Sequence, residues 1–352
     1  MEENSKKKIN RKKQVTLADI AKVVGVGNMT VSRALRTPEK VSDAVRQKVE
    51  KVALEMGYLT PIQAKLTQNT GLILVHSSDY LAYFELFSAL QDMLHKANIN
   101  FLIDSSIRNS DDETNKLKLL TYIKPSFVIL SATPHSGETT YLLSDLNIPV
   151  IEILSEIPTP IDINIGISQQ KSMHDLTTKH IDHGYSDICF VCDNSDIWKI
   201  KQQIIGWQRA MISRGLNPEK TLNIPQSFHF SKSSSVVPDI LFQWPTTQLI
   251  LCSSTQIANA IICECLRRKI KIPEVLSIAS IGSLDVAQSL YPSLSNVDIP
   301  FAELAKDIYN VIKQCLNGAP IEHKKMIREA HIQLRESSSR RKPKPYTKND
   351  WF

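Results

Sequence analysis

The chain has 352 residues, of which 42% are hydrophobic and 22% are charged, a composition that is ordinary for a globular protein and excludes a fibrous or wholly disordered chain. No apolar run reaches the roughly 18 residues that a transmembrane helix needs. The basic segment 6–13 leads into no apolar stretch of the kind that a secretory signal requires. We therefore expect a cytoplasmic protein with more than one compact unit.

The net charge of +6 is concentrated at one end of the chain. Residues 1–69 carry 14 Lys or Arg against 7 Asp or Glu, whereas the remaining residues carry 28 against 29. A basic end on a near-neutral body favours a polyanionic partner such as nucleic acid, because neutralising phosphates releases counterions. A solvated basic tail without a partner is the alternative explanation of the charge alone.

After the basic segment, the pattern predicts three short helices. Thr16 and Asp19 have the spacing of a capping box, so the first helix starts directly after Thr16. Gly25 ends that helix, and a second helix is predicted from Asn28 to Leu35. Ser42 is the expected N-cap of a third helix. The apolar stripe of this third helix consists of Val45, Val49, Val52, Ala53 and Met56.

The first two helices have the spacing of a helix-turn-helix. In that motif a small residue lies where the helices cross, a glycine suits the turn, and an apolar residue anchors the second helix, which enters the major groove of DNA. Ala21, Gly25 and Val31 occupy those positions. Gly25 suits a turn with positive φ, which other residues adopt at a cost. Any three-helix unit can have small and apolar residues at these intervals, and this alternative stays open for the spacing alone.

From about Gly71 onwards, short apolar runs alternate with helical stretches. The runs of strand length are Leu72–Val75, Phe101–Ile103, Phe127–Leu130, Val150–Leu154, Ile188–Val191, Leu249–Leu251 and Ile278–Ile281. The helical stretches include Tyr83–Lys96, Ser172–His183 and Thr255–Arg268. This alternation predicts parallel sheets covered by helices, an α/β architecture, and the length suits two lobes.

The helix-turn-helix region matches a known family almost position by position. The matching segments are Val15–Ala21, Gly25-Val26, Thr30–Leu35, Val41-Ser42 and Gly57-Tyr58. This pattern resembles the headpiece of the lactose-repressor (LacI) family, and within it residues 28–42 resemble the gluconate-operon repressor branch. Landmarks of the body resemble the periplasmic-binding-protein-like core of the same family; they include Gly184-Tyr185, Gly206-Trp207, Ile281-Gly282, Pro292–Leu294 and Arg335–Ser337.

The resemblance implies an N-terminal helix-turn-helix headpiece followed by a two-lobed α/β core. The expected organisation is a basic disordered arm (1–14), the DNA-binding headpiece (15–59), a hinge or linker (60–70), an effector-binding and dimerisation core (71–339) and a disordered basic tail (340–352). It also implies a homodimeric regulator that binds a palindromic operator and responds to a small ligand. Whether the ligand induces or corepresses stays open.

The resemblance assigns DNA contacts to particular residues. Asn28, Met29 and Arg33 are expected to read bases, since Asn suits adenine, Arg suits guanine and Met suits a thymine methyl group. The other expected DNA contacts, mostly to phosphates that set the register, are Thr16, Leu17, Thr30, Ser32, Arg36 and Ser42. An exposed salt bridge is the alternative role for Arg33.

In the family, a leucine in the hinge wedges into the minor groove and kinks the duplex. Leu66 is the candidate here, although it lies one residue closer to Tyr58 than the family pattern places it, and the usual Pro-Asn pair is absent. Either a deletion has been accommodated or the bending of DNA differs. Packing of Leu66 on the core is the alternative.

The ligand of the core is less clear from the sequence. By position, Gln203 stands where sugar-binding members often have an arginine, Ser254-Thr255 replaces an Asn-Asp pair, and Ser283 replaces an aspartate. Fewer acidic groups suit an anionic ligand such as gluconate or a related sugar acid, because a carboxylate disfavours nearby negative charge. A pocket that binds another ligand, or none, is the alternative. The expected effector-binding residues are Tyr83, Lys201, Gln203, Thr255 and Ser283.

No enzyme, cofactor or metal centre is expected. The sequence lacks the common nucleotide-binding, metalloprotease and hydrolase motifs, so an enzyme fused to a DNA-binding module is the disfavoured alternative. Cys189 and Cys192 lie in a predicted buried strand, where side chains three apart point to opposite faces and cannot share a metal. His174, His180 and His183 share a predicted helix, where we expect exposed side chains rather than metal ligands.

Overall fold

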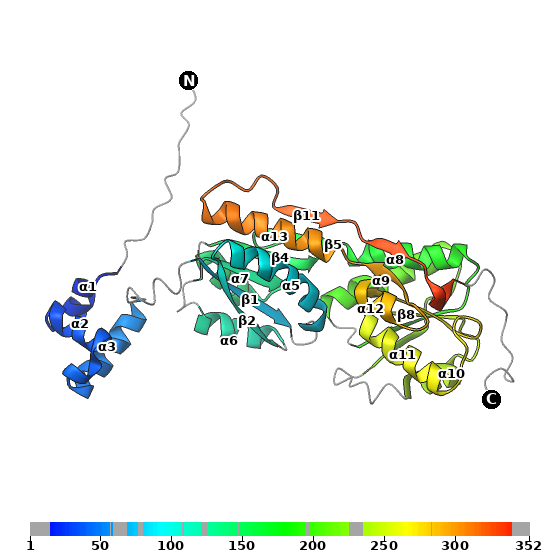
Figure 1. Ribbon diagram of the computed structural model, residues 1–352, viewed down its shortest axis with the longest axis horizontal. Helices are drawn as coiled ribbons and strands as arrows, with labels where there is room; N and C mark the ends of the chain where they lie inside the picture. The colour runs from blue at the N-terminus through cyan, green and yellow to red at the C-terminus, as the bar shows by residue number, and fades with distance from the viewer. Residues whose placement is uncertain are drawn as a thin grey trace, which may run out of the picture.

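The computed structural model describes residues 15–56, 58, 69–76, 80–107, 109–120, 125–146, 148–193, 197–224, 235–282 and 284–339 (Figure 1). The expected basic arm, most of the expected hinge and the basic tail lie outside these residues. None of the helices within them is long and apolar enough to cross a membrane.

The headpiece has the predicted three helices, α1 (Leu17–Val24), α2 (Asn28–Arg36) and α3 (Asp43–Glu55), with a short 3₁₀ turn η1 (Pro38–Lys40) between the last two. They share one apolar cluster, whose buried members are Ile20, Ala21, Val24, Val31, Ala34, Val49 and Ala53. The helix-turn-helix prediction is therefore confirmed in its geometry.

Local sequence explains the boundaries of α1. The N–H of Asp19 donates to Thr16 Oγ1 at 3.3 Å, and the N–H of Thr16 donates to the Asp19 carboxylate at 2.8 Å, which completes the predicted capping box. Gly25 ends the helix with φ of 80°, and a Cβ at this position would meet no atom within 4 Å. The turn therefore requires glycine for its left-handed backbone and not for space.

The first lobe of the core is built on a parallel sheet with the order β11-β5-β4-β3-β1-β2. Its strands are β1 (Thr70–His76), β2 (Asn100–Ile107), β3 (Phe127–Ser131), β4 (Val150–Ser155), β5 (Ile163–Ile167) and β11 (Lys325–Arg328). Its helices are α5 (Tyr80–Lys96), α6 (Ser110–Leu120), α7 (Gly137–Leu146) and α13 (Phe301–Leu316). Apolar residues of α6 and α7 pack on one face of this sheet, and those of α5 and α13 pack on the other.

The second lobe has a sheet of order β12-β10-β9-β8-β6-β7, in which β12 alone runs antiparallel to its neighbour. Its strands are β6 (Ile188–Cys192), β7 (Thr221–Asn223), β8 (Leu249–Cys252), β9 (Ser277–Gly282), β10 (Ser295–Asp298) and β12 (His331–Gln333). Its helices are α8 (Gln169–Asp182), α9 (Trp198–Ser213), α10 (Val236–Gln243), α11 (Thr255–Arg267) and α12 (Leu284–Ser289), followed near the end of the chain by a 3₁₀ turn η4 (Glu336–Ser338).

Within the described residues, the chain passes between the lobes at three points. Ser168 links β5 to α8, residues 299–300 link β10 to α13, and residues 329–330 link β11 to β12. Figure 1 shows the two lobes side by side, with β11 and β12, between which the chain passes from one lobe to the other, along one side. One apolar cluster contains residues of both sheets, so the lobes share a core at the crossings.

The structure tests the predicted burial of the cysteines on β6 and the predicted exposure of the histidines on α8. Cys189 and Cys192 point into different apolar clusters on opposite faces of β6, as predicted. The expectation of exposed histidines on α8 is wrong for His180, which is fully buried. Its ring lies 2.8 Å from the Leu176 carbonyl and 2.8 Å from Ser338 Oγ, so it fixes the C-terminal segment to α8.

Candidate DNA-binding face and effector site

Helix α2 has one buried and one exposed face. Val31 and Ala34 are buried against α1 and α3. Met29 and Arg33 lie on the opposite face and are exposed, and Asn28 is exposed in the first turn of the helix; Met29 is 67% exposed although it is apolar. A methionine on a solvent-facing helix surface is available for contact with an apolar group of a partner. The three residues expected to read bases are therefore all exposed on one helix.

The Arg33 guanidinium has no hydrogen bond or ion pair with any side chain that the structure describes, so the alternative of a salt bridge for Arg33 finds no partner there. Helix α3 is tied to α1, because Lys48 Nζ of α3 donates to the Val24 carbonyl at the end of α1 at 3.2 Å. Among the described residues, Arg33 is therefore an unpaired cation on the exposed surface of α2.

The other expected DNA contacts surround this face with different exposures. Thr16, Arg36 and Ser42 are exposed, whereas Thr30 and Ser32 are half-buried. Leu17 packs partly against the headpiece core. Ser42 precedes α3, and its carbonyl accepts the N–H of Arg46 at 2.9 Å, as the N-cap position requires. Leu66 lies outside the described residues.

In the second lobe, two of the expected effector residues have unused hydrogen-bonding capacity. Gln203 of α9 is buried and donates to Gln169 Oε1 at 2.9 Å, but its own Oε1 has no partner among the described residues. Thr255, the first residue of α11, is also buried, and no described residue pairs with its Oγ1. The same holds for the buried hydroxyls of Ser253, directly after β8, and Ser280, inside β9.

Sequence reasoning missed Ser253 and Ser280, although Ser253 directly follows β8 and Ser280 lies within the predicted strand Ile278–Ile281. In open α/β sheets, ligands bind outside the carboxyl ends of the strands where the strand order reverses. Strands β6 and β8 are adjacent at that point of the second sheet, and Ser253 directly follows β8. Buried polar groups without partners are rare, which makes this edge a candidate for binding polar ligand groups.

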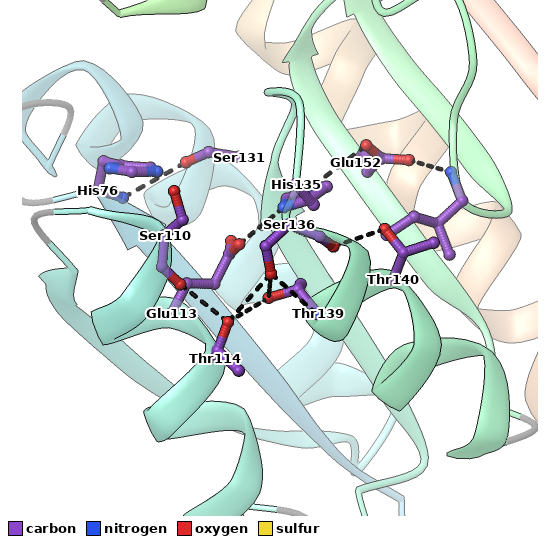
Figure 2. Close-up of polar contacts among 11 residues, drawn as sticks. His76, Ser110, Glu113, Thr114, Ser131, His135, Ser136, Thr139, Thr140 and Glu152 are labelled. Carbon is purple, nitrogen blue, oxygen red and sulfur yellow. Dashed lines mark hydrogen bonds and ion pairs between the residues drawn. The ribbon is translucent and has the colours of Figure 1, made fainter.

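The corresponding edge of the first lobe lies at the ends of β1 and β3. The Tyr83 hydroxyl donates to Ser131 Oγ at 2.7 Å, so the expected effector residue Tyr83 is buried and fixes Ser131 instead of being free. The backbone N–H of His76 also points to Ser131 Oγ, at 3.4 Å (Figure 2). Lys201 is exposed on α9, and Ser283 lies outside the described residues.

A buried charged cluster lies beside this edge. His135, in the loop between β3 and α7, lies between Glu113 of α6 and Glu152 of β4 (Figure 2). His135 Nδ1 is 2.8 Å from Glu113 Oε2, and Nε2 is 3.3 Å from Glu152 Oε1. The other Glu152 oxygen accepts the N–H of Ile161 at 2.6 Å. The cluster therefore joins a loop, a helix and a strand of the first lobe.

The two carboxylates set the charge of His135. Burial by itself lowers the pKa of this histidine, but its hydrogen bond to Glu113 and its ion pair with Glu152 outweigh burial and raise its pKa to about 9. The ring is therefore a cation at neutral pH. Because its two nitrogens face different carboxylates, the three side chains do not converge on one point, and no metal-binding group of this kind is found among the residues described.

The pattern around Glu152 carried a signal of this cluster. A glutamate inside the apolar run Val150–Leu154 has to be buried with the strand, and a buried carboxylate needs a charged or hydrogen-bonding partner. The partners lie 39 and 17 residues earlier in the chain, and no local pattern identifies them.

Comparison with known families agrees with this architecture. A family model described as bacterial regulatory proteins, lacI family, matches residues 16–61, and one described as a periplasmic binding protein-like domain matches residues 178–338. Among curated proteins, the chain is 26% identical over 294 residues to the HTH-type transcriptional regulator GntR of Escherichia coli (strain K12), which covers 82% of this chain and 88% of that protein.

Solved structures show the same fold. The lac repressor dimer bound to operator and the anti-inducer ONPF superposes with a TM-score of 0.69 at 15% identity, covering 93% of this chain and 99% of that chain. The transcription regulator GntR from Chromobacterium violaceum superposes with a TM-score of 0.71 at 20% identity, covering 76% of this chain and 99% of that chain. These similarities cover the helix-turn-helix region and both lobes.

Proposed function

Because the chain belongs to the LacI family of DNA-binding transcription regulators, which have a ligand-binding core and are not enzymes, we propose that it is a homodimeric repressor whose operator affinity is set by a sugar acid. The observation that carries the DNA-binding part of the proposal is the exposed face of α2 with its unpaired Arg33. A chromosomal operator would place the site of action in the cytoplasm.

The chemistry of α2 suits direct readout in the major groove. The Arg33 guanidinium can donate two hydrogen bonds to guanine, the Asn28 amide can pair with adenine, and Met29 can contact a thymine methyl group. Thr16, Thr30, Ser32, Arg36 and Ser42 would contact phosphates around this helix, with Leu17 beside them. The proposal assigns sequence specificity to the first set and register to the second.

An exposed apolar edge of the first lobe supports a dimer. Strand β2 is an edge of its sheet, and Leu102 on it is 48% exposed, while Phe84 on α5 is 62% exposed. Exposed apolar residues on a sheet edge are a liability unless another chain covers them. A second copy related by a two-fold axis would cover this edge on both chains and would present two headpieces to a palindrome. The lac repressor in the superposed structure is a dimer bound to operator.

The hinge would couple the headpiece to the core. In this proposal, Leu66 inserts into the minor groove at the centre of the operator, and its displacement by one residue changes the size of the kink. DNA bending by the wild-type protein and by Leu66→Ala tests this part. An unchanged bend in the variant would assign Leu66 to packing on the core.

The proposed effector is a sugar acid such as gluconate, bound between the lobes. The resemblance of residues 28–42 to the gluconate-operon repressor branch supports this class of ligand. Gln203, Thr255 and Ser253 would offer uncharged hydrogen-bonding groups, which tolerate a ligand carboxylate better than acidic side chains do. Tyr83, Lys201 and Ser283 complete the proposed set, with Lys201 as the cation.

Calorimetric titration of the full-length protein with D-gluconate, with D-glucose as the uncharged control, tests the ligand class. The proposal expects binding of gluconate and weaker or no binding of glucose. Binding of glucose alone would replace the sugar acid with a neutral sugar and would leave the DNA-binding proposal untouched.

A further inference from the structure

A hydrogen bond outside the three chain crossings joins the two lobes. The indole N–H of Trp198 donates to the backbone carbonyl of Glu156 at 3.3 Å. Trp198 is the first residue of α9 and belongs to the second lobe, whereas Glu156 directly follows β4 of the first lobe. We call this contact the interlobe latch. It shows that the carboxyl end of β4 and the start of α9 lie against each other.

The acceptor side of the latch is fixed in the first lobe. The N–H of Glu156 donates to the Ile167 carbonyl of β5 at 2.8 Å. Its carboxylate pairs with Lys325 Nζ of β11 at 2.9 Å. The hydrogen bond from Lys325, together with one from Ser168, outweighs burial and lowers the pKa of Glu156. Ser168 is one of the chain crossings, and β11 leads directly into another, so Glu156 is tied to residues at two of the three crossings.

The donor side of the latch belongs to the second lobe. Helix α9 is anchored by buried side chains that include Ile200 and Trp207, and Trp207 stacks on Phe190 of β6 with ring centroids 5.8 Å apart. Trp198 itself is half-buried at the start of this helix. An indole has one polar hydrogen and accepts no hydrogen bond, so its N–H pairs either with Glu156 or with water. Rotation of one lobe against the other would replace the hydrogen bond to Glu156 with a hydrogen bond to water.

From this geometry we infer that Trp198 is a positioning residue that holds the lobes in the arrangement seen here, and thereby sets how tightly a ligand between them is retained. The part that concerns a ligand rests on the proposed function, but the latch between the lobes does not. If a ligand binds only the latched arrangement, its apparent affinity rises with the population of that arrangement. A contact such as the latch raises this population without touching the ligand. The expected ligand is the sugar acid proposed above.

The test uses the full-length protein and compares Trp198→Phe with Trp244→Phe. Phenylalanine keeps an aromatic ring at position 198 and removes only the indole N–H donor and part of the ring area. Trp244 is the matched control because it directly follows α10 in the same lobe and packs on that lobe's own apolar cluster. Amide hydrogen exchange read by mass spectrometry, without ligand, reports the opening of residues 153–158 and 197–202.

The latch predicts that Trp198→Phe raises the exchange rate in both segments by about 3- to 10-fold, the range expected for losing one hydrogen bond, while Trp244→Phe leaves them unchanged. Equal rates in wild-type protein and Trp198→Phe would overturn the inference. Faster exchange in both variants would also overturn it, since that result describes a general loss of stability in the second lobe.

A second pair of variants tests the acceptor side. Glu156→Gln removes the charge that pairs with Lys325, whereas Asp162→Asn breaks the neighbouring pair between Lys324 and Asp162, which are 2.7 Å apart. The latch predicts faster exchange at 197–202 for Glu156→Gln only. The same effect in both variants would show that charge near β11, and not the latch, controls the lobes.

The ligand arm then uses D-gluconate as the probe. If wild-type protein binds it, Trp198→Phe should weaken binding by about 3- to 10-fold and Trp244→Phe should not. Equal gluconate affinity in Trp198→Phe would overturn the link from latch to ligand. Absence of gluconate binding in wild-type protein would count against the proposed effector, and the exchange measurement would still decide on the latch.

Discussion

Nδ1 of His135 lies 2.8 Å from Oε2 of Glu113, with both side chains buried in the first lobe. The second ring nitrogen faces Glu152, which is also buried. The imidazolium is therefore the cation that allows two carboxylates to stay inside the protein. It joins the loop after β3 to α6 and β4 next to the edge proposed for the effector.

Removing this cation should destabilise the first lobe. His135→Gln leaves Glu113 and Glu152 buried without a positive partner, and breaking a buried ion pair from one side costs about 3–5 kcal/mol. Urea denaturation at neutral pH measures the loss. His183→Gln is the control, since His183 is exposed and its replacement should change the free energy of unfolding by less than about 0.5 kcal/mol. Equal midpoints for the two variants would contradict the role of His135.

The same cluster predicts a pH dependence of stability. The pKa of His135 is raised from 6.5 to about 9 in the folded protein, so the stabilisation is complete below pH 6.5 and is lost as the pH rises through about 9. The shift corresponds to roughly 3 kcal/mol. Urea midpoints measured between pH 6 and 10 should fall for wild-type protein and change much less for His135→Gln. Parallel curves would show that another group causes the dependence.

Much of the fold could be predicted from the sequence, because local patterns determine it. The capping box at Thr16, the turn at Gly25 and the apolar runs of the main strands are each readable from neighbouring residues. Strands β5, β7, β10, β11 and β12 are missing from the predicted set. Strand β5 is fully buried, but Asn164 and Gly166 interrupt its apolar run, and the other four are short, so their pairing is decided by distant parts of the chain.

The polar sites were harder to predict for the same reason. Sequence position alone indicated Gln203 and Thr255, and each has a buried atom without a partner among the described residues. Tyr83, indicated in the same way, instead donates its hydroxyl to Ser131. The partners of His135, and the contact between Trp198 and Glu156, join residues that only the tertiary fold brings together.

Two arginines on α2 should differ in how they affect DNA binding. Arg33→Ala is expected to lose about 1–3 kcal/mol of discrimination between operator and unrelated duplex, because Arg33 reads a base, while salt-sensitive nonspecific binding remains. Arg36→Ala should weaken binding to all sequences alike and lower the salt slope by about one. Fluorescence anisotropy at several salt concentrations separates the two. A uniform loss for Arg33→Ala would assign it to a phosphate.

Two glycines next to the turn should respond oppositely to substitution. Gly25→Ala forces a side chain into the left-handed region and should cost about 1 kcal/mol in the stability of the headpiece. Gly27 is the N-cap of α2, with φ of −72° and no side-chain cap, so Gly27→Ser should stabilise the headpiece by a few tenths of a kcal/mol. Thermal unfolding followed by circular dichroism measures both changes. Loss of stability in both variants would mean that close packing, not backbone conformation, requires glycine there.

The unpaired hydroxyl of Thr255 offers a test of the effector site. Thr255→Val keeps the shape and removes a buried polar group without a partner, so the free energy of unfolding should stay equal or rise by up to about 1 kcal/mol. Gluconate binding should weaken by up to about tenfold. Thr177→Val is the control for the same change of side chain at a buried threonine whose hydroxyl is already paired, since Thr177 donates to the Met173 carbonyl at 2.7 Å inside α8. Unchanged affinity for gluconate in Thr255→Val would remove Thr255 from the site.

The central claim is that this regulator reads one palindromic operator through α2 and that a sugar acid changes the strength of this binding. Selection of bound duplexes from a random library by the full-length protein, with and without D-gluconate, tests it most directly. We expect enrichment of one palindrome whose affinity changes with gluconate. Enrichment that is indifferent to gluconate would contradict the effector, and no enriched sequence at moderate salt would contradict sequence-specific binding by α2.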